Sequence, residues 1–308
     1  MLDTLIRVLV FFAFIGLGVL LVRFKRLNAQ GLDGLSAYFY WIGFPSWLMV
    51  SFARLPAISP ALAGTVGGYV AAMITTAVVV MLVARLIKAP SEAATAAGMA
   101  AYINNSAFLG IPIALSLFGT EAIHTGPVVV AADFLILFSL GCAGLAKASG
   151  HTHREALMHT ARNPTVIGGL IGVIMMLAGF QFLPPVENAL DVLGKSGPPV
   201  ALVALGGMLG LMEPRMVVRA EPVSVLAIAG KILLAPALVA IVMTLLRVDP
   251  ATFKVCVFLS ATPTAVSVFI QTKMYGTWYE GAARTVAQGT VASLLTLSAL
   301  AIVLTHMA

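Results

Sequence analysis

Long apolar stretches separated by short polar segments run along the whole chain. A helix needs about 20 apolar residues to cross the hydrocarbon core of a bilayer. Such stretches lie at 4–23, 33–53, 61–86, 93–118, 123–146, 164–182, 192–212, 223–246, 252–275 and 281–305. The pattern predicts an all-α integral membrane protein with ten transmembrane helices, which form a single transmembrane domain over residues 1–308.

The composition excludes the soluble classes of protein. Of the 308 residues, 60% are hydrophobic and only 10% are charged, whereas a soluble domain carries about 25% charged residues. Because so few charges cannot cover a surface that faces water, a soluble enzyme, a nucleic-acid-binding protein and a disordered protein are all excluded. We therefore expect the lipid bilayer to surround most of the chain.

The basic residues indicate how the chain is oriented. If the amino terminus lies outside, 12 of the 18 Lys and Arg residues fall at cytoplasmic span ends and four fall in outer loops. Since cytoplasmic loops are enriched in Lys and Arg, we expect both termini on the non-cytoplasmic side of the cell inner (plasma) membrane. We expect the first stretch to be a mature span, because Asp3 precedes it and Arg23, Lys25 and Arg26 follow it, the reverse of the charge order in a signal peptide.

Neither a metal nor a cofactor is expected. Cys142 and Cys256 lie within apolar stretches and lack the spacing of metal ligands. The longest connection contains His151, His153 and His159, but no cluster of carboxylates or thiols joins them. We therefore expect a solvated loop there and not a metal site. The chain also lacks a nucleotide-binding motif, so ATP-driven pumping by this chain alone is not expected.

Prolines recur at similar places in the two halves of the chain. Pro45 and Pro199 are 154 residues apart, and Pro112 and Pro263 are 151 residues apart. Each half, 1–150 and 160–308, then holds five apolar stretches. Because five is odd, the second half must enter the membrane from the opposite side. The pattern therefore predicts two inverted five-helix repeats, an architecture found in many secondary transporters.

The fourth and ninth stretches carry polar residues around a proline. The fourth contains NNSAFLGIP at 104–112, and the ninth contains SATPTAVS at 260–267. Since proline lacks an N–H and clashes with the preceding turn, we expect both helices to break. A break in lipid is tolerated only where its backbone is buried or lines a wet cavity. Two breaks at matched depth predict a shared polar site, and the alternative is a passive kink at each proline. Pro45 and Pro199 lack polar neighbours and are interpreted as kinks or hinges.

Each break should leave the beginning of a half-helix facing this site. Unpaired N–H groups and the positive end of the helix dipole suit a carboxylate, and Pro112 and Pro263 suit the first turn after each break. Amides and hydroxyls would add directional hydrogen bonds without a charge that must be neutralised when the carrier moves empty. The candidate substrate-binding residues are Asn104, Asn105, Ser106, Gly110, Pro112, Ser260, Thr262, Pro263, Thr264 and Ser267.

Two formal charges are expected deep within the spans, Asp133 in the fifth and Lys231 in the eighth. A charge at the centre of the bilayer costs about 2.5–3.5 kcal/mol, so such a residue is expected to have a function. Three alternatives are open: the two pair with each other, Asp133 carries a coupling proton while Lys231 supports the anion, or broken-helix backbone satisfies each separately. A repeat shift of 155 residues places Gln288 at the position of Asp133, and Thr76 at that of Lys231. Gln288 is thus a further candidate.

The segments around the two breaks resemble a known family, the auxin efflux carriers. Its Asn-x-Gly-Phe-x-Gly-x-Pro segment is matched, with Ala107 in place of the usual glycine, by Asn105, Phe108, Gly110 and Pro112. The segment LSATPTAVSVFIQTKMYG at 259–276 resembles the second proline segment of the family, with Ser267 where asparagine is common. The stretch 231–236 and the pair Asn163-Pro164 are also similar to family positions.

This resemblance implies a crossover fold like that of sodium/proton antiporters, in which helices 4 and 9 cross at their broken points. It implies a scaffold of helices 1, 2, 6 and 7, a transport core of helices 3–5 and 8–10, and a homodimer formed through the scaffold. It also implies carriage of organic carboxylates, which are auxin in the plant members and malonate- or malate-type anions in the bacterial ones.

Together these observations predict a secondary transporter and not an enzyme. It would move a small organic anion by alternating access, in a rocking or elevator motion, with protons or sodium as candidate coupling ions. The alternatives are an anion channel and an intramembrane enzyme. A channel would tend to show rings of like residues, and an intramembrane enzyme would need a catalytic set at membrane depth. Neither is found in the sequence.

Overall fold

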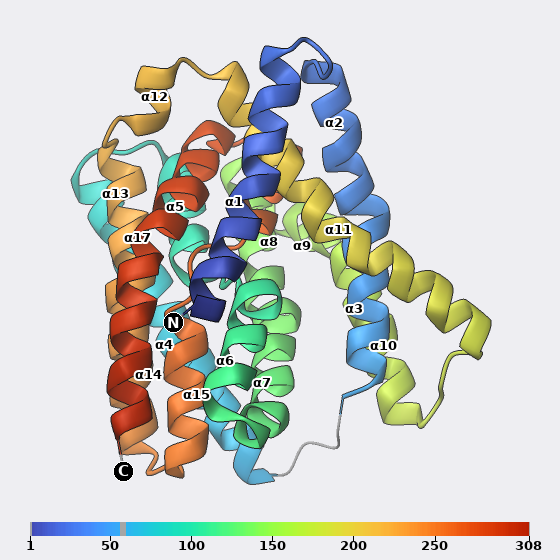
Figure 1. The fold of residues 1–308 in the computed structure, drawn as a ribbon, viewed down its shortest axis with the longest axis vertical. Coiled ribbons are helices and arrows are strands. Elements are labelled where there is room, and N and C mark those ends of the chain that lie inside the picture. Colours follow the sequence, from blue (N-terminus) through green and yellow to red (C-terminus); the bar gives the residue numbers. More distant parts are fainter. Residues whose placement is uncertain (1, 56–59, 308) are drawn as a thin grey trace.

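Helices form all of the regular secondary structure in residues 2–55 and 60–307, which are the residues that the computed structural model describes (Figure 1). Side chains at 2–12, at 60–62 and at several single positions, among them Phe108 and Pro112, lie outside the described part. Each apolar stretch of the sequence coincides with one helix or with a series of adjoining helices.

The helices follow one another with short connections. Those of the first half are α1 (Leu2–Arg23), α2 (Ala29–Tyr38), α3 (Phe44–Ala53), α4 (Pro60–Leu86), α5 (Ser91–Tyr102), α6 (Ile111–Phe118), α7 (Thr120–Ala132) and α8 (Phe138–Ala148). Those that follow are α9 (His153–Ala161), α10 (Pro164–Ala178), α11 (Pro184–Leu211), α12 (Pro214–Val218), α13 (Pro222–Ala229), α14 (Ala235–Leu245), α15 (Pro250–Ser260), α16 (Val266–Met274) and α17 (Tyr279–His306). π-helical turns join some of them, namely η1 (Phe39–Gly43), η2 (Ser106–Gly110), η3 (Asp133–Leu137) and η4 (Gly230–Leu234).

By length and composition, five helical segments of the described residues can each cross a membrane. They are Ala63–Leu86, Thr125–Ala148, Pro184–Leu211, Pro222–Leu245 and Tyr279–His306. A sixth is added if α9 and α10, which are bent by 60° at their junction, form one span. Several of the remaining apolar stretches are divided into shorter helices. Ten spans and the inverted repeat therefore stay predictions.

Three of the π-helical turns come directly before a proline. Pro45 follows η1, Pro112 follows η2 and Pro236 follows η4, each at the second position of the next α-helix. Proline has no N–H, and its ring clashes with the carbonyl group one turn back, so a widened turn relieves the clash. Pro45 thus lies in a helix that continues through η1, and Pro199 lies inside α11.

The helices pack in two groups. In the α11 group, α11 packs against α1, α2 and α3, and α10 packs against α3. In the α4 group, α4 packs against α5 and α14, α15 against α7 and α14, and α17 against α13 and α16. Figure 1 shows α3, α10 and α11 on the right and α13, α14 and α17 on the left. The two groups contain the helices that the resemblance assigns to the scaffold and to the core, and their roles stay predictions.

Glycines allow close packing inside the α11 group. A Cβ atom on Gly168 of α10 would lie 2.6 Å from the carbonyl oxygen of Pro45, and one on Gly172 would lie 2.6 Å from that of Met49. Lipid tails are as apolar as leucine, so helices in a membrane associate through close contacts of this kind and not through a hydrophobic driving force. The backbones of α3 and α10 are therefore in direct contact.

We expect Gly168→Val to lower the melting temperature of the purified protein in detergent. The added side chain meets backbone, which cannot move aside as a flexible side chain can, and overpacking of this kind costs about 1–3 kcal/mol. Gly67→Val on α4 is the matched control, because Gly67 is exposed and nothing lies within 4 Å of its Cβ position. Equal melting temperatures for the two variants would contradict the tight contact of α3 with α10.

Candidate functional site

Two interrupted helices meet in the middle of the molecule. The chain leaves the helix at residues 103–105, between α5 and η2, and again at 261–265, between α15 and α16. The N–H of Asn105 donates to the carbonyl of Pro263 at 2.9 Å, and the N–H of Ala265 donates to the carbonyl of Ile103 at 3.1 Å. These bonds pair Asn104 with Thr264 in an antiparallel bridge. We call this region the crossing.

The prolines do not lie where the sequence interpretation placed them. Pro112 lies seven residues after the first interruption, behind η2, and so it is not in the first turn after the break. Pro263 lies inside the second interruption, before α16 begins. The first interruption instead contains Asn104 and Asn105, a residue type whose side chain competes with helical hydrogen bonding. Pro112 is accommodated by the widened turn η2, without a break.

Asp133 lies directly against the first interruption. It is 1% exposed and lies on η3. One carboxylate oxygen accepts from the hydroxyl of Tyr69 at 3.0 Å, the other accepts from the hydroxyl of Ser106 at 2.8 Å, and Nδ2 of Asn104 lies 3.1 Å from both. The same Nδ2 lies 2.6 Å from the hydroxyl oxygen of Tyr69. Three side chains, from α4, the first interruption and η2, thus hold one buried carboxylate.

Lys231 is fully buried on η4 and interacts with the second interruption. Its ammonium group donates to the backbone carbonyl of Ser260, the last residue of α15. Unpaired carbonyls and the negative end of the helix dipole make the end of a helix suitable for a cation. Among the described ion pairs, none within 4.0 Å joins Lys231 to Asp133. In this conformation side-chain donors surround Asp133 and broken-helix backbone accepts from Lys231, and the roles of the two charges stay predictions.

Several candidate residues stabilise the crossing, and their side chains have no hydrogen-bond donor left over for a ligand. The hydroxyls of Ser260, Thr262 and Thr264 donate to backbone carbonyls at 2.8, 2.7 and 2.7 Å. A Cβ on Gly110 would lie 2.8 Å from Cδ2 of Leu259, so the small residue lets η2 approach α15. These residues, with the Pro263 carbonyl, use their polar groups or their small size to hold the two interrupted helices together.

Asn105 and Ser267 retain hydrogen-bonding groups that no described residue uses. Each is 2% exposed. Both amide atoms of Asn105, the hydroxyl of Ser267 and the Oδ1 atom of Asn104 have no hydrogen-bond partner in the described part of the chain. A buried polar group without a partner costs about 1–3 kcal/mol. These atoms are therefore the groups at the crossing that remain for a ligand.

Gln288 is placed elsewhere. Its Nε2 atom donates to the carbonyl of Arg219 at 3.3 Å, and the residue is half-buried, more than two turns into α17. The residues that the bridge pairs at the two interruptions, Asn104 and Thr264, are 160 residues apart, and the repeat shift that suggested Gln288 was 155. The network around Asp133 instead includes Tyr69, which the sequence analysis missed because a tyrosine in an apolar stretch carries no motif.

A second buried polar cluster lies between the two helix groups. Nδ2 of Asn163, the residue before α10, lies 3.1 Å from Oε1 of Gln271 on α16 and 3.5 Å from Sγ of Cys142 on α8. All three residues are fully buried, and Nε2 of Gln271 has no partner among the described residues. Asn163 stood out in the sequence only through the resemblance, and Gln271 gave no separate signal.

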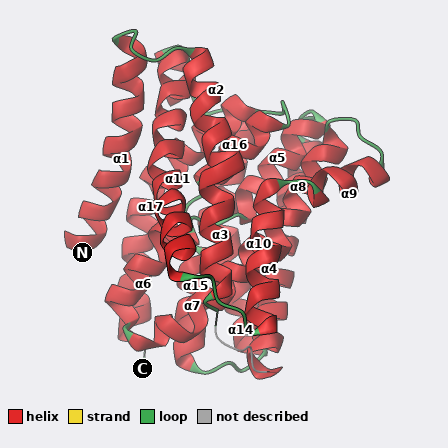
Figure 2. Ribbon diagram, turned by 90° about the vertical axis from the view of Figure 1, so that its right-hand side faces the viewer, coloured by secondary structure: helices red, strands yellow, loops and turns green. Residues whose placement is uncertain are grey.

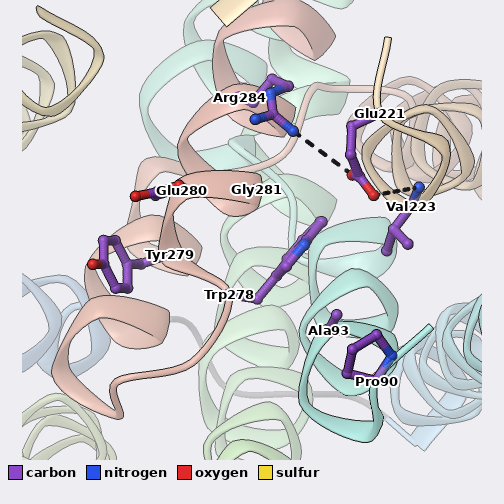
Figure 3. Close-up of a pocket in the computed structure, with 9 residues that line it drawn as sticks. All are labelled: Pro90, Ala93, Glu221, Val223, Trp278, Tyr279, Glu280, Gly281 and Arg284. Atoms are coloured by element: carbon purple, nitrogen blue, oxygen red, sulfur yellow. Dashed lines mark hydrogen bonds and ion pairs between the residues drawn. The ribbon is translucent and has the colours of Figure 1, made fainter. Parts of the chain in front are cut away.

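A cavity of about 400 Å³ lies at the other end of α5 from the crossing (Figure 3). Its walls come from the beginnings of α5, α13 and α17. Arg284 lies 3.8 Å from the carboxylate of Glu221, which also accepts from the N–H groups of Val223 and Ser224 and so caps α13. The cavity includes none of the residues of the crossing, and we do not assign the substrate to it.

The comparison with protein families supports the resemblance read from the sequence. A search of the curated proteins finds no match. The model of the family described as membrane transport protein matches residues 4–301, which include both interruptions, Asp133 and Lys231. The chain therefore belongs to this family, that of the auxin efflux carriers, and is a multi-pass membrane transport protein.

Proposed function

We propose that the protein is a secondary transporter of small organic anions that binds a carboxylate at the crossing. One observation carries the proposal, the side chain of Asn105. It is buried beside the first interruption, and neither of its amide atoms has a partner in the described structure. An unpaired amide in this position is costly in the empty protein. A carboxylate oxygen accepting from Nδ2 would remove part of that cost.

A carboxylate suits the rest of the crossing as well. The residues before η2 and α16 are Asn105 and Ala265, and neither makes a side-chain cap. The first N–H groups of a helix lack partners within the helix, and its dipole favours an anion there. The free hydroxyl of Ser267 lies in the first turn of α16. Auxin-like monocarboxylates and malonate- or malate-type dicarboxylates are the substrates that the family suggests.

The formal charges of two buried residues at the crossing are opposite in sign. Asp133 and Lys231 lie at the two interruptions, so together they add no net formal charge. A bound carboxylate would bring one negative charge into this region. Uptake of a proton by Asp133 would compensate for it, and this is how we propose that transport is coupled to protons. Sodium is the second candidate, since the Asp133 carboxylate and the unpaired Oδ1 of Asn104 are oxygen ligands.

Alternating access would come from movement of one helix group against the other. We propose that the α11 group is the scaffold and that the α4 group, which holds both interruptions, is the transport core. The scaffold would also form a homodimer. We propose that the protein lies in the inner (plasma) membrane with both termini on the non-cytoplasmic side, as the distribution of Lys and Arg favours.

We expect Asn105→Ala to abolish saturable uptake of labelled malonate or indole acetate into liposomes. Loss of one hydrogen bond to a charged group, worth about 1.5–3 kcal/mol, corresponds to roughly 10- to 100-fold weaker binding. A thermal-shift screen against small carboxylates would select the substrate beforehand, because a ligand stabilises the folded state by mass action. Asn188→Ala, on the exposed side of α11, is the matched control and should transport normally.

Undiminished uptake by Asn105→Ala would remove the proposed site. Unitary current steps in planar bilayers, in place of saturable uptake, would instead identify the protein as an anion channel.

We expect Asp133→Asn to make uptake independent of an imposed pH gradient, because the amide keeps the shape of the side chain but can neither gain nor lose a proton. Tyr69→Phe is the control. It removes one hydrogen bond to the carboxylate and keeps the carboxylate itself, so the response to the gradient should remain. The measurement is the initial rate of uptake with and without the gradient. A gradient response that persists in Asp133→Asn would assign a purely structural role to Asp133.

A further inference from the structure

The helix α16 connects the crossing with the α11 group. Its first turn carries Ser267, whose free hydroxyl lies at the second interruption. One turn later it carries Gln271, and at its end Lys273. A helix of nine residues is a stiff element that rises about 1.5 Å per residue. A shift of its first turn is therefore carried to Gln271 and Lys273.

Gln271 makes the first contact with the α11 group. Its Oε1 atom accepts from Nδ2 of Asn163 at 3.1 Å, and Asn163 caps α10 by accepting from the N–H of Thr165 at 3.0 Å. The thiol of Cys142 lies beside both, 3.7 Å from the same oxygen of Gln271. The contact is closed to solvent but incompletely bonded, because Nε2 of Gln271 has no partner among the described residues.

Lys273 makes the second contact. Its ammonium group lies 2.9 Å from the carboxylate of Asp33, which is on α2 in the α11 group. The side chain of Lys273 is 16% exposed and that of Asp33 is 67% exposed, so the pair lies at the edge of the boundary between the groups. Figure 2 shows α2, α11 and α16 next to one another at this end of the molecule. By contrast, the ion pair of Arg54 with Glu187 joins α3 to α11 within one group.

From these two contacts we propose that Gln271–Asn163 and Lys273–Asp33 form a latch that holds the two helix groups together on one side of the crossing. The latch opens when the core moves, and α16 couples it to occupancy of the site at Ser267. This proposal rests on the proposed alternating access. Its chemistry suits a reversible closure, since an ion pair with one exposed partner and an incompletely bonded amide are both weak compared with the glycine contacts inside the α11 group.

Cys142, a cysteine already present in the chain, can be used to measure whether the latch is open or closed. It is fully buried and contacts both Asn163 and Gln271, so its thiol should be shielded while the latch is closed. The other cysteine, Cys256, is fully buried within α15. The full-length Cys256→Ala protein in liposomes therefore has one thiol, whose rate of labelling by N-ethylmaleimide measures opening. The assay needs no substrate.

We expect Asp33→Ala to raise the labelling rate of Cys142 about two- to fivefold, as loss of a partly exposed ion pair would. Asn163→Ala should raise it about tenfold or more, because a buried hydrogen bond is lost. The exchange Asp33→Lys with Lys273→Asp should restore the slow rate. Glu187→Ala is the matched control, since it removes an ion pair within one group, and it should leave the rate unchanged.

If Asp33→Ala and Asn163→Ala both label Cys142 at the wild-type rate, the latch is overturned. An equal increase in Glu187→Ala, or failure of the charge exchange to restore the rate, would also overturn it, because either would show general loosening. These outcomes are separate from the proposed function. If uptake depends on Asn105 but the latch variants label Cys142 at the wild-type rate, the latch alone is overturned. If the latch variants label Cys142 at the expected rates but the protein takes up no carboxylate, the proposed function alone is overturned.

Discussion

The backbone pairing between the two interrupted helices is the constraint on which the rest of the site depends. In a bilayer, an unbonded N–H or C=O group is several kcal/mol less stable than a bonded one, so a helix can open only where its free groups find partners inside the protein. Here each interruption supplies partners for the other, through Asn105 with Pro263 and Ala265 with Ile103. Neither break is stable without the other. Two segments far apart in the sequence are thereby fixed at one point, and helix beginnings from both halves face a common region.

The charged residues follow from the same constraint. Opening a helix produces a beginning that favours anions and an end that favours cations. Lys231 uses the end of α15, whereas Asp133 is held by side-chain donors, one of which is the hydroxyl of Ser106 at the beginning of η2. Among the described residues, no hydrogen bond or ion pair places a charged side chain at the beginning of α16. This is the physical reason for proposing that an external anion binds there, where the side chains of Asn105 and Ser267 at the crossing have no partner among the described residues.

The sequence predicted the class of the protein, the existence of both interruptions and the family, because each rests on a local pattern. The long apolar stretches, the NNS segment and the proline segments are all visible without knowledge of the fold.

The sequence could not predict which polar groups form hydrogen bonds within the protein. Thr264 and Ser267 look alike in the sequence, but Thr264 bonds to Ala100 and Ser267 bonds to no described residue. Tyr69 and Gln271 were missed, and Gln288 was misplaced, for the same reason. Their positions depend on which helices adjoin in the fold, which the spacing of prolines along the chain does not reveal.

Different chemistry holds the molecule together within the α11 group and between the groups. Inside the α11 group, glycines bring backbones into contact, and these contacts have a single close-packed geometry. Between the groups, α16 adds an ion pair at the edge and an amide with one unused donor. Polar contacts of this kind can be exchanged for others at small cost, because each group can find another partner or water. The proposed alternating access needs one part that stays rigid and one boundary that can open, and the distribution of glycines and of paired polar groups supports such a division of this chain.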